Sequence, residues 1–332
     1  MSLTGFSSRT AAIVLFFASG RLFAQESAVD AISSKVRQLF EEKKSAVVQV
    51  EAEDTRGTIR GTGFYIDAMG TLFTLAAMAD GTENVSVIAG GKKIPAKVLA
   101  CDTRSGIALL QTAGCSAFIV PGDSSQLAIA SPVVMIGYPL DLDLSPGFGL
   151  ISGFDRKFAD VYFSTTHLRV NVPVMRGQGG SPILNMDGQV VGIVISSVDN
   201  GATCYVLPIN AAEKILSDYA RFGEARHGWV GVKVDPAGEP VQGSSAVIGE
   251  LDPETPASKS GLKKGDVLLR VGDIEIHKPE DVLDASFFLT AGDTTEIQVL
   301  RDGKPVTLGV ETVLHPWASK PALQAGPSLM GN

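Results

Sequence analysis

RGQGGSPIL, residues 176–184, is the stretch on which the interpretation of this chain depends. Its three glycines loosen the backbone into a turn, and QVVGIVISS, just downstream, is a short β-rich run. Many short strands with turn signals between them predict a β-barrel or a sandwich. Such runs fill residues 46–209, with Gly, Asp, Asn and Pro between them: AVVQVEAE, GTGFYID, TLFTLAAMA, NVSVIAG, IPAKVLA, IALLQT, PVVMIGYP, GLISGF, VYFSTTHLRVNV, QVVGIVISS and TCYVLPI.

Segments with helical spacing flank this region on both sides. AVDAISSKVRQLFEEKKS, residues 28–45, has apolar residues at helical intervals and predicts one amphipathic helix. INAAEKILSDYARFG, residues 209–223, predicts a second helix that ends on a glycine suited to a C-terminal cap.

The segment from about residue 228 carries its own start and stop signals. Thr255 can cap a helix that has Pro256 at its first position and Gly261 just past its end. KPEDVLDASFFL, residues 278–289, predicts a second helix, while VLLRV-GD-IEI and EIQVL-RDGK-PVTLGV each predict two strands joined by hairpin-turn residues. We therefore expect a small domain of strands plus two helices.

Length and composition limit the classes of function. The 332 residues have room for two ordinary domains, and 45% hydrophobic with 19% charged residues is normal for a globular protein. A net charge of -8 argues against a nucleic-acid partner, because phosphates demand a basic face. The four histidines lack the paired spacing of a metal site, and the sequence has no phosphate-binding Gly-Lys-Ser/Thr loop. We therefore expect no metal and no cofactor.

The first residues have the pattern of a secretory signal peptide. Arg9 precedes an apolar run over residues 11–18, and the small residue Ala24 precedes polar sequence. A membrane anchor needs roughly 20 apolar residues, and Arg21 interrupts this run well before that. Residues 1–24 are therefore predicted to be a signal peptide, and the mature protein is predicted to be exported, to the periplasm or another extracytoplasmic place.

An ordered series of motifs covers residues 28–314: GTGFYID with the following TLFT, DTRSGIALLQ, PGDSS, MIGYP, GLISG, RGQGGSPILNMDGQVVGI, YVLPIN and HGWVGVKV. In this order and spacing they resemble the HtrA/DegP family of exported, trypsin-fold proteases with a C-terminal PDZ domain. The resemblance implies a mainly β fold. We expect a double β-barrel, trypsin-like (chymotrypsin-fold) domain at residues 28–225 and an α+β PDZ domain at 228–314, with a flexible tail at 315–332.

The resemblance also locates the three positions at which such an enzyme keeps its Ser-His-Asp triad. The general base belongs to a Thr-x-x-His-Val-Val pattern, and Ala77 stands in the place of that histidine. The carboxylate belongs to an Asp-x-x-x-Asp-Ile-Ala-Leu-Leu pattern, and Gly106 stands in its place. The nucleophile of a Gly-x-Ser-Gly-Gly-Pro loop is replaced by Gly179. We therefore predict no catalytic residues and interpret the chain as a pseudoprotease.

The loop around Gly179 leaves other interpretations open. An active serine endopeptidase could use a non-standard site around Ser181, the serine on that loop, but it would need a nearby base. His167 is the one histidine of the barrel region, and it lies on the strand that leads into the loop. The N–H groups of Gly177 and Gly179 could still hold a substrate carbonyl or carboxylate as a former oxyanion loop, or the loop could have collapsed.

The PDZ-like segment keeps the features of a peptide-binding site. PDZ domains add a peptide as an extra strand and seat its carboxylate on backbone N–H groups. Trp229, Val230, Gly231 and Val232 resemble the family's carboxylate-binding loop. The alternative is a domain that only packs against the barrels, as in a structural interaction module of the cell envelope.

These features together predict an exported adaptor, regulator or chaperone in envelope protein quality control. Its expected partner is a polypeptide ligand or an exported client protein. The resemblance also implies a homotrimer, or a mixed assembly with an active HtrA-like protease, formed through the start of the barrel domain, where Leu39 and Phe40 could supply apolar contacts.

Overall fold

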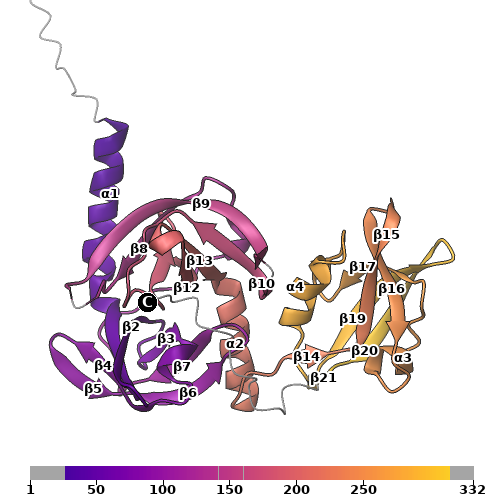
Figure 1. Ribbon diagram of the computed structural model, residues 1–332, viewed down its shortest axis with the longest axis horizontal. Helices are drawn as coiled ribbons and strands as arrows, with labels where there is room; N and C mark the ends of the chain where they lie inside the picture. Colours follow the sequence, from indigo (N-terminus) through magenta and orange to yellow (C-terminus); the bar gives the residue numbers. More distant parts are fainter. Residues whose placement is uncertain (1–26, 141, 160, 315–332) are drawn as a thin grey trace, which may run out of the picture.

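The computed structural model describes residues 27–140, 142–159 and 161–314. They form a mainly β structure in which a larger N-terminal part is joined by a short segment to a smaller C-terminal domain (Figure 1). The predicted signal peptide and the predicted tail lie outside the described residues. No helix among the described residues is both long and apolar enough to cross a membrane.

The first part of the chain forms a seven-stranded antiparallel sheet with the order β5-β4-β1-β2-β3-β7-β6. Two predicted strands were wrong in extent, because IPAKVLA divides at Ala96 between β5 and β6, and TLFTLAAMA leaves the strand after Leu75 to form a single 3-10 turn, Ala76–Met78. The strands are β1 (Val47–Asp54), β2 (Gly57–Tyr65), β3 (Thr71–Leu75), β4 (Glu83–Ala89), β5 (Lys92–Pro95), β6 (Lys97–Asp102) and β7 (Ile107–Gln111).

The second set of strands closes into a six-stranded barrel with the order β10-β13-β12-β11-β8-β9. Its interior is filled by aliphatic side chains such as Val133, Ile151 and Val206, none of which is more than 1% exposed. The strands are β8 (Pro132–Gly137), β9 (Ser145–Phe158), β10 (Val161–Val170), β11 (Pro182–Leu184), β12 (Val190–Val198) and β13 (Thr203–Pro208).

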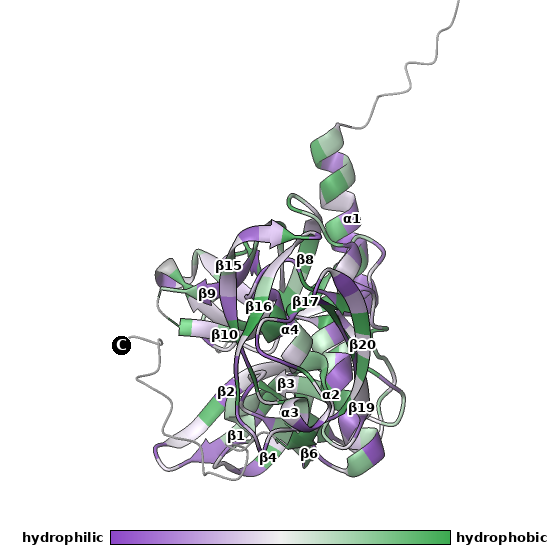
Figure 2. Ribbon diagram, turned by 90° about the vertical axis from the view of Figure 1, so that its right-hand side faces the viewer, coloured by the Kyte–Doolittle hydropathy of each residue, from purple (hydrophilic) through white to green (hydrophobic). Residues whose placement is uncertain are grey.

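Two longer helices begin and end near the predicted residues. Helix α1 (Ala28–Lys43) begins after Ser27, whose side chain accepts a hydrogen bond from the Asp30 N–H. Its first turns project away from the strands, and hydrophobic and hydrophilic residues alternate along them (Figure 2). Helix α2 (Ile209–Phe222) packs between the strands and ends on Gly223, which has the predicted left-handed conformation with φ 78°.

The C-terminal domain is built on a sheet with the order β15-β16-β17-β19-β20, with β18 paired to β17 and a separate β14-β21 pair. Thr255 caps α3 as predicted, because its side chain accepts a hydrogen bond from the Ser258 N–H. The elements are β14 (Gly228–Trp229), β15 (Val232–Val241), β16 (Ser244–Leu251), α3 (Pro256–Lys259), β17 (Val267–Val271), β18 (Ile274–Glu275), α4 (Asp281–Phe288), β19 (Thr294–Arg301), β20 (Lys304–Glu311) and β21 (Val313–Leu314).

The C-terminal domain rests on the barrel through α4, which faces β10 (Figure 1). Phe287 of α4 is fully buried and belongs to the same apolar cluster as Ile209 and Ile215 of α2. Asp284 accepts hydrogen bonds from Arg156 of β9 and from Thr165 and Thr166 of β10. The docking of the two parts therefore combines an apolar anchor with a buried network of charged and polar groups.

Candidate functional site

The three positions that the sequence predicts for a catalytic triad lie close together in the structure. Ala77 lies in the 3-10 turn after β3, where the neighbouring Ala76 N–H donates to the Gly106 carbonyl over 2.8 Å. Gly179 lies in the loop before β11, and a Cβ built on it would come within 2.3 Å of the Leu75 Cδ1. The residues at the three predicted positions therefore lie near one another, and none of them has a nucleophilic, basic or carboxylate side chain.

Aliphatic side chains occupy the space around these positions. Leu75 and Met78 are buried in one apolar cluster, and Ile195 of β12 packs against the same cluster. A Cβ on Gly106 would lie 3.0 Å from the Ile195 Cγ2. We call Leu75, Met78 and Ile195 the apolar plug. Because the plug touches the positions of Gly106 and Gly179, side chains restored there would have to displace it.

The loop before β11 is held in shape by Thr62 of β2. The Thr62 N–H donates to the Gly179 carbonyl over 2.9 Å, and the Thr62 hydroxyl donates to the Gly177 carbonyl over 2.8 Å. That hydroxyl also accepts a hydrogen bond from the Tyr138 N–H. Within the described ranges, the Gly177 and Gly179 N–H groups have no hydrogen-bond acceptor. The loop is thus fixed by its carbonyls, while two of its N–H groups remain unused.

Two of the loop's glycines are required by the backbone, but Gly179 is not. Gly177 has φ 89° and Gly180 has φ 84°, both in the left-handed region that favours glycine. A Cβ on Gly180 would also come within 2.2 Å of the Thr62 carbonyl oxygen. Gly179 lies outside that region, so its backbone tolerates a side chain and only Leu75 opposes one.

Ser181 does not have the surroundings of a nucleophile. Its side chain is fully buried, and its hydroxyl has no hydrogen-bond partner among the residues that the structure describes. The hydroxyl packs against Gly137, where a Cβ would be only 2.0 Å away. His167 holds its Nδ1 2.8 Å from the Thr165 carbonyl oxygen and stacks on Phe163, and burial lowers the pKa of its ring. No activating base is therefore hydrogen-bonded to Ser181.

A buried carboxylate–imidazole pair lies outside the positions predicted for a triad. The Asp102 Oδ1 lies 3.0 Å from the His227 Nε2. Burial alone would raise the pKa of Asp102, but the hydrogen bonds from His227 and Ser105 outweigh it and keep this pKa below its usual value. The other nitrogen of His227 is buried without a partner among the described residues, and the ring lies against Phe287. The pair therefore fastens β6 to the segment between the domains and offers no nucleophile.

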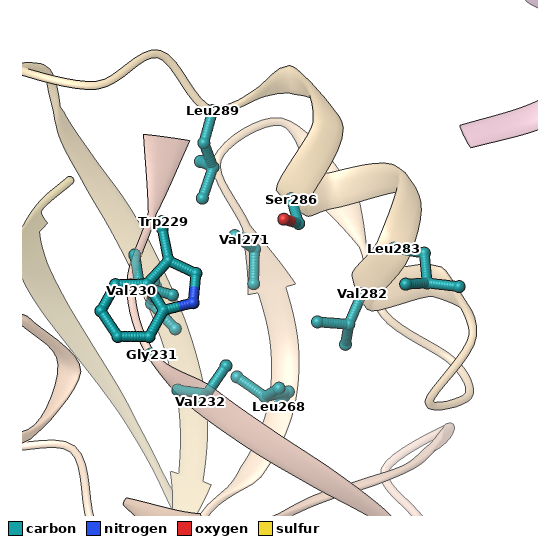
Figure 3. Close-up of a pocket in the computed structure, with 11 residues that line it drawn as sticks. Trp229, Val230, Gly231, Val232, Leu268, Val271, Val282, Leu283, Ser286 and Leu289 are labelled. Carbon is teal, nitrogen blue, oxygen red and sulfur yellow. The ribbon is translucent and has the colours of Figure 1, made fainter. Parts of the chain in front are cut away.

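The predicted peptide-binding loop lines a groove in the C-terminal domain. Trp229, Val230, Gly231 and Val232 form one wall of a cavity of about 200 Å³, and α4 forms the other (Figure 3). Gly231 has φ 77°, which turns the chain between β14 and β15. Its N–H and that of Val230 find no acceptor in the part of the chain that the structure describes. The loop thus presents unpaired donors at one end of the groove.

The floor and the helical wall of this groove were not predicted from the sequence. Val282, Leu283, Ser286 and Leu289 come from α4 and the residue after it, while Leu268, Val271 and Ile297 come from β17 and β19. Val271, Val282 and Ser286 point into the space between the loop and the helix (Figure 3). The spacing of Val282, Ser286 and Leu289 places them on one helix face, a signal that was present in the sequence.

The side of α4 that faces away from the groove binds the barrel through two carboxylates. Besides Asp284, Asp281 forms an ion pair with Arg156 over 2.8 Å. Burial by itself raises the pKa of Asp284, but the hydrogen bonds from Thr166, Arg156 and Thr165 together keep it below the usual value. The domain therefore does pack against the barrel, and it does so while its groove stays open. No group of three or more His, Cys, Asp or Glu within the described residues is arranged to hold a metal ion.

Two protein families match this chain, one in each of its two parts. The trypsin-like peptidase domain family matches residues 61–193, and the PDZ domain family matches residues 228–312. The predicted fold class is confirmed: a mainly β chain with a trypsin-like domain followed by a PDZ domain.

Curated relatives are named "Probable periplasmic serine endoprotease DegP-like". The one from Halomonas elongata is 30% identical over 258 residues, which cover 74% of this chain and 54% of that protein. The one from Rhizobium meliloti is 27% identical over 286 residues, covering 82% of this chain and 56% of that protein. The chain thus spans about half the length of the curated relatives it matches. Their names confirm the predicted exported, periplasmic location.

Solved structures show the same fold at low sequence identity. "HtrA-type protease AlgW with tripeptide" has a TM-score of 0.71 at 20% identity and covers 85% of this chain and 97% of that chain. The serine endoprotease from Yersinia pestis has a TM-score of 0.63 at 20% identity and covers 84% of this chain and 98% of that chain. At these identities the likeness is one of fold.

Proposed function

The chain is HtrA/DegP-like, a trypsin-type domain followed by a PDZ domain, and we propose that it is an exported pseudoprotease that binds polypeptides through its PDZ domain without cutting them. In this role it acts as an adaptor, regulator or chaperone in envelope protein quality control. Its ligand is a polypeptide C-terminus or an unfolded segment of an exported client.

The observation that carries the proposal is the apolar plug. Peptide hydrolysis by a triad needs a hydroxyl, an imidazole and a carboxylate within hydrogen-bond distance of one another. At the corresponding place this chain has Ala77, Gly106 and Gly179, and Leu75 fills the space that a side chain on Gly179 would need. Backbone donors alone leave rates roughly 10³ to 10⁴ above water, which is negligible beside a working triad.

The groove of the C-terminal domain supplies the binding activity. A PDZ-type ligand needs donors for its carboxylate, an open strand edge for its main chain and an apolar pocket for its last side chain. The loop at Val230 and Gly231 has unpaired N–H groups, β15 is an outer strand of its sheet, and the pocket is lined mainly by aliphatic residues. Structures of the HtrA-type protease AlgW carry a tripeptide or a decapeptide, which supports a polypeptide ligand for this fold.

Digestion of casein by the purified mature protein tests the absence of catalysis. The wild type is compared with Ser181→Ala, because Ser181 is the centre of the rival account in which the chain is an active endopeptidase. We expect no fragments from either protein above the buffer blank. Cleavage by the wild type that disappears in Ser181→Ala would overturn the pseudoprotease assignment and make Ser181 a nucleophile. Cleavage by both proteins would also reject the proposal, since another residue would then be catalytic.

We also propose that the chain assembles with copies of itself, or with an active HtrA-like protease, through α1. Ile32, Val36 and Phe40 of α1 line an apolar groove with Pro146 and Phe148 of β9. Leu39, which was also expected to make such contacts, is only 1% exposed within this chain and is not available for them. A helix that projects from the body with an uncovered apolar side is only marginally stable on its own. A second copy covering this groove would remove that surface from water. Light scattering at micromolar concentration should give a trimer mass, and a monomer alone would reject this assembly.

A further inference from the structure

The open edge of β15 limits how many residues of a ligand can pair with the groove. β15 lies at the end of its sheet, and among the described residues β16 is its one strand partner. The start of β15 borders the groove, since Val232 lines the cavity opposite α4. A ligand that adds a strand to this sheet must therefore pair along β15, beginning at Val232.

The register of β15 shows which of its residues offer main-chain groups to a ligand. Val232 faces Leu251, Val234 faces Ile248 and Pro236 faces Ala246. Because alternate residues of an antiparallel strand bond to opposite sides, Val232, Val234 and Pro236 present their main-chain groups to the same edge.

Between Val232 and Val234 the irregularity in this pairing lies on β16, which has three residues where β15 has two, so the alternation along β15 is unbroken from Val232 to Pro236. A second irregularity, between Pro236 and Val241, lies on β15 itself.

Pro236 indicates that these main-chain groups face the open edge of β15, and it also interrupts the hydrogen bonding along that edge. A proline in a sheet is accommodated on an edge strand with its missing N–H turned away from the partner strand. Pro236 therefore turns its nitrogen to the open edge, where Val232 and Val234 offer both an N–H and a carbonyl. From Pro236 onward the edge cannot continue a regular ladder, because β15 also becomes irregular between Pro236 and Val241.

We propose that the groove reads the last four residues of a polypeptide C-terminus and that Pro236 sets this limit. The inference rests on the proposed peptide-binding function. In an antiparallel ligand the terminal residue lies opposite Val232 and the third from the end lies opposite Val234. The fifth from the end meets Pro236, whose nitrogen has no hydrogen to give to the ligand carbonyl.

The length of α4 agrees with this limit. The helix has eight residues, which is about 12 Å at 1.5 Å per residue. Four residues of an extended ligand span about 13 Å at 3.3 Å per residue. Past the fourth residue the ligand therefore leaves both the helical wall and the paired part of the strand. Its last side chain enters the aliphatic pocket, so an aliphatic C-terminal residue is expected.

The test is a length series of peptides on the full chain. N-terminally labelled peptides of three, four, five, six and eight residues share one C-terminal sequence that ends in an aliphatic residue, and fluorescence anisotropy gives their Kd values. Affinity should rise up to four residues and then change by less than about twofold up to eight. An eight-residue peptide that binds ten times more tightly than the four-residue one would overturn the limit.

Pro236→Ala supplies the missing N–H and tests the cause. We expect the five-, six- and eight-residue peptides to bind this variant about 2- to 10-fold more tightly, the range of one added hydrogen bond, with no change for the three- and four-residue peptides. Pro240→Ala is the matched control in the same strand beyond the four-residue reach, and it should change nothing. Pro236→Ala without any gain for longer peptides would contradict the role of Pro236.

The outcomes separate the inference from the function on which it rests. If no peptide of any length binds the wild type, the proposed peptide-binding function fails. If peptides bind and their affinity keeps rising with length, the function stands and the four-residue limit fails. A C-terminally amidated four-residue peptide should bind at least about tenfold more weakly, because the unpaired N–H groups of the loop then face no carboxylate.

Discussion

A serine at Gly179, the position predicted for the nucleophile, should destabilise this protein instead of activating it. The Gly179→Ser side chain would place its Cβ 2.3 Å from the Leu75 Cδ1, far inside van der Waals contact. The backbone at Gly179 does not oppose the change, so the whole cost comes from Leu75. Overpacking a well-filled core costs about 1–3 kcal/mol. For a domain of this size, that corresponds to a fall in Tm of about 2–12 °C.

The same clash predicts how a second substitution should behave. Leu75→Ala alone removes a buried leucine and should cost about 2–5 kcal/mol. In the double variant the serine occupies part of the space that the leucine left, so its cost should be smaller than the sum of the two single costs by about 1–3 kcal/mol. Thermal unfolding of the four proteins, followed by far-UV circular dichroism, gives this coupling.

Matched controls keep the test specific to the plug. Gly238→Ser is a control for adding a serine, because a Cβ on Gly238 meets nothing within 4 Å. It should leave the Tm unchanged. The reasoning is refuted if Gly179→Ser has the same Tm as the wild type. It is also refuted if the stability cost of Gly179→Ser is the same with and without Leu75, because the plug then does not fill the space beside Gly179.

Three further predictions concern the groove and the docking of the domains. Gly231→Ala should weaken binding of a four-residue C-terminal peptide at least about tenfold in fluorescence anisotropy, because the new Cβ would lie 2.5 Å from the Thr255 Cβ at φ 77°, while Gly238→Ala should bind normally. Asp284→Asn should weaken the docking of the C-terminal domain on the barrel by about 3 kcal/mol, because it breaks the buried ion pair with Arg156. Hydrogen exchange in residues 281–288 should then be faster. Unchanged exchange would contradict a role of the Asp284 hydrogen bonds in docking. The pKa of Asp284 is lowered in the folded protein, so its contribution is present above the unfolded pKa of about 4 and is lost as pH falls through the folded value. The radius of gyration from X-ray scattering should therefore stay constant from pH 7 to about 5 and increase below about pH 4 in the wild type, and the same acid expansion in Asp284→Asn would assign it to other groups.

Most of the architecture could be predicted because it depends on local signals. Short β-rich runs, the glycine after α2 and the Thr255–Pro256 start of α3 are each encoded within a few residues. Apart from the extents of TLFTLAAMA and IPAKVLA, these features lie where expected. The helix predicted over residues 278–289 is shorter in the structure, because α4 runs from Asp281 to Phe288, with Glu280 as its N-cap. The error is small because prolines and acidic residues favour several neighbouring starts.

The apolar plug could not be predicted, because it depends on contacts between distant segments. The sequence predicts the loss of a triad at Ala77, Gly106 and Gly179, but nothing local says that Leu75 fills the space beside Gly179. The burial of Ser181 has the same origin, since its environment is made by Gly137 of β8. Sequence patterns identify which chemical groups are present, while their accessibility is decided by packing.

Docking through α4 was missed for a related reason. Asp284 and Phe287 look in the sequence like an exposed and an apolar position of an ordinary short helix. The structure gives each a partner more than 60 residues away, as in the hydrogen bond from Arg156 to Asp284 across 128 residues. The helix thus serves two partners, with the groove on one side and the barrel on the other.

The central claim is that this chain holds polypeptide ends without cutting them, and one incubation tests it most directly. A labelled unfolded substrate with an aliphatic C-terminus is mixed with the mature protein, its bound fraction is measured by anisotropy, and its mass is then read by mass spectrometry after several hours. We predict saturable binding that is lost in Gly231→Ala, with the substrate recovered intact. Fragments that form in proportion to the amount of wild-type protein would contradict the claim, as would an intact substrate that never binds.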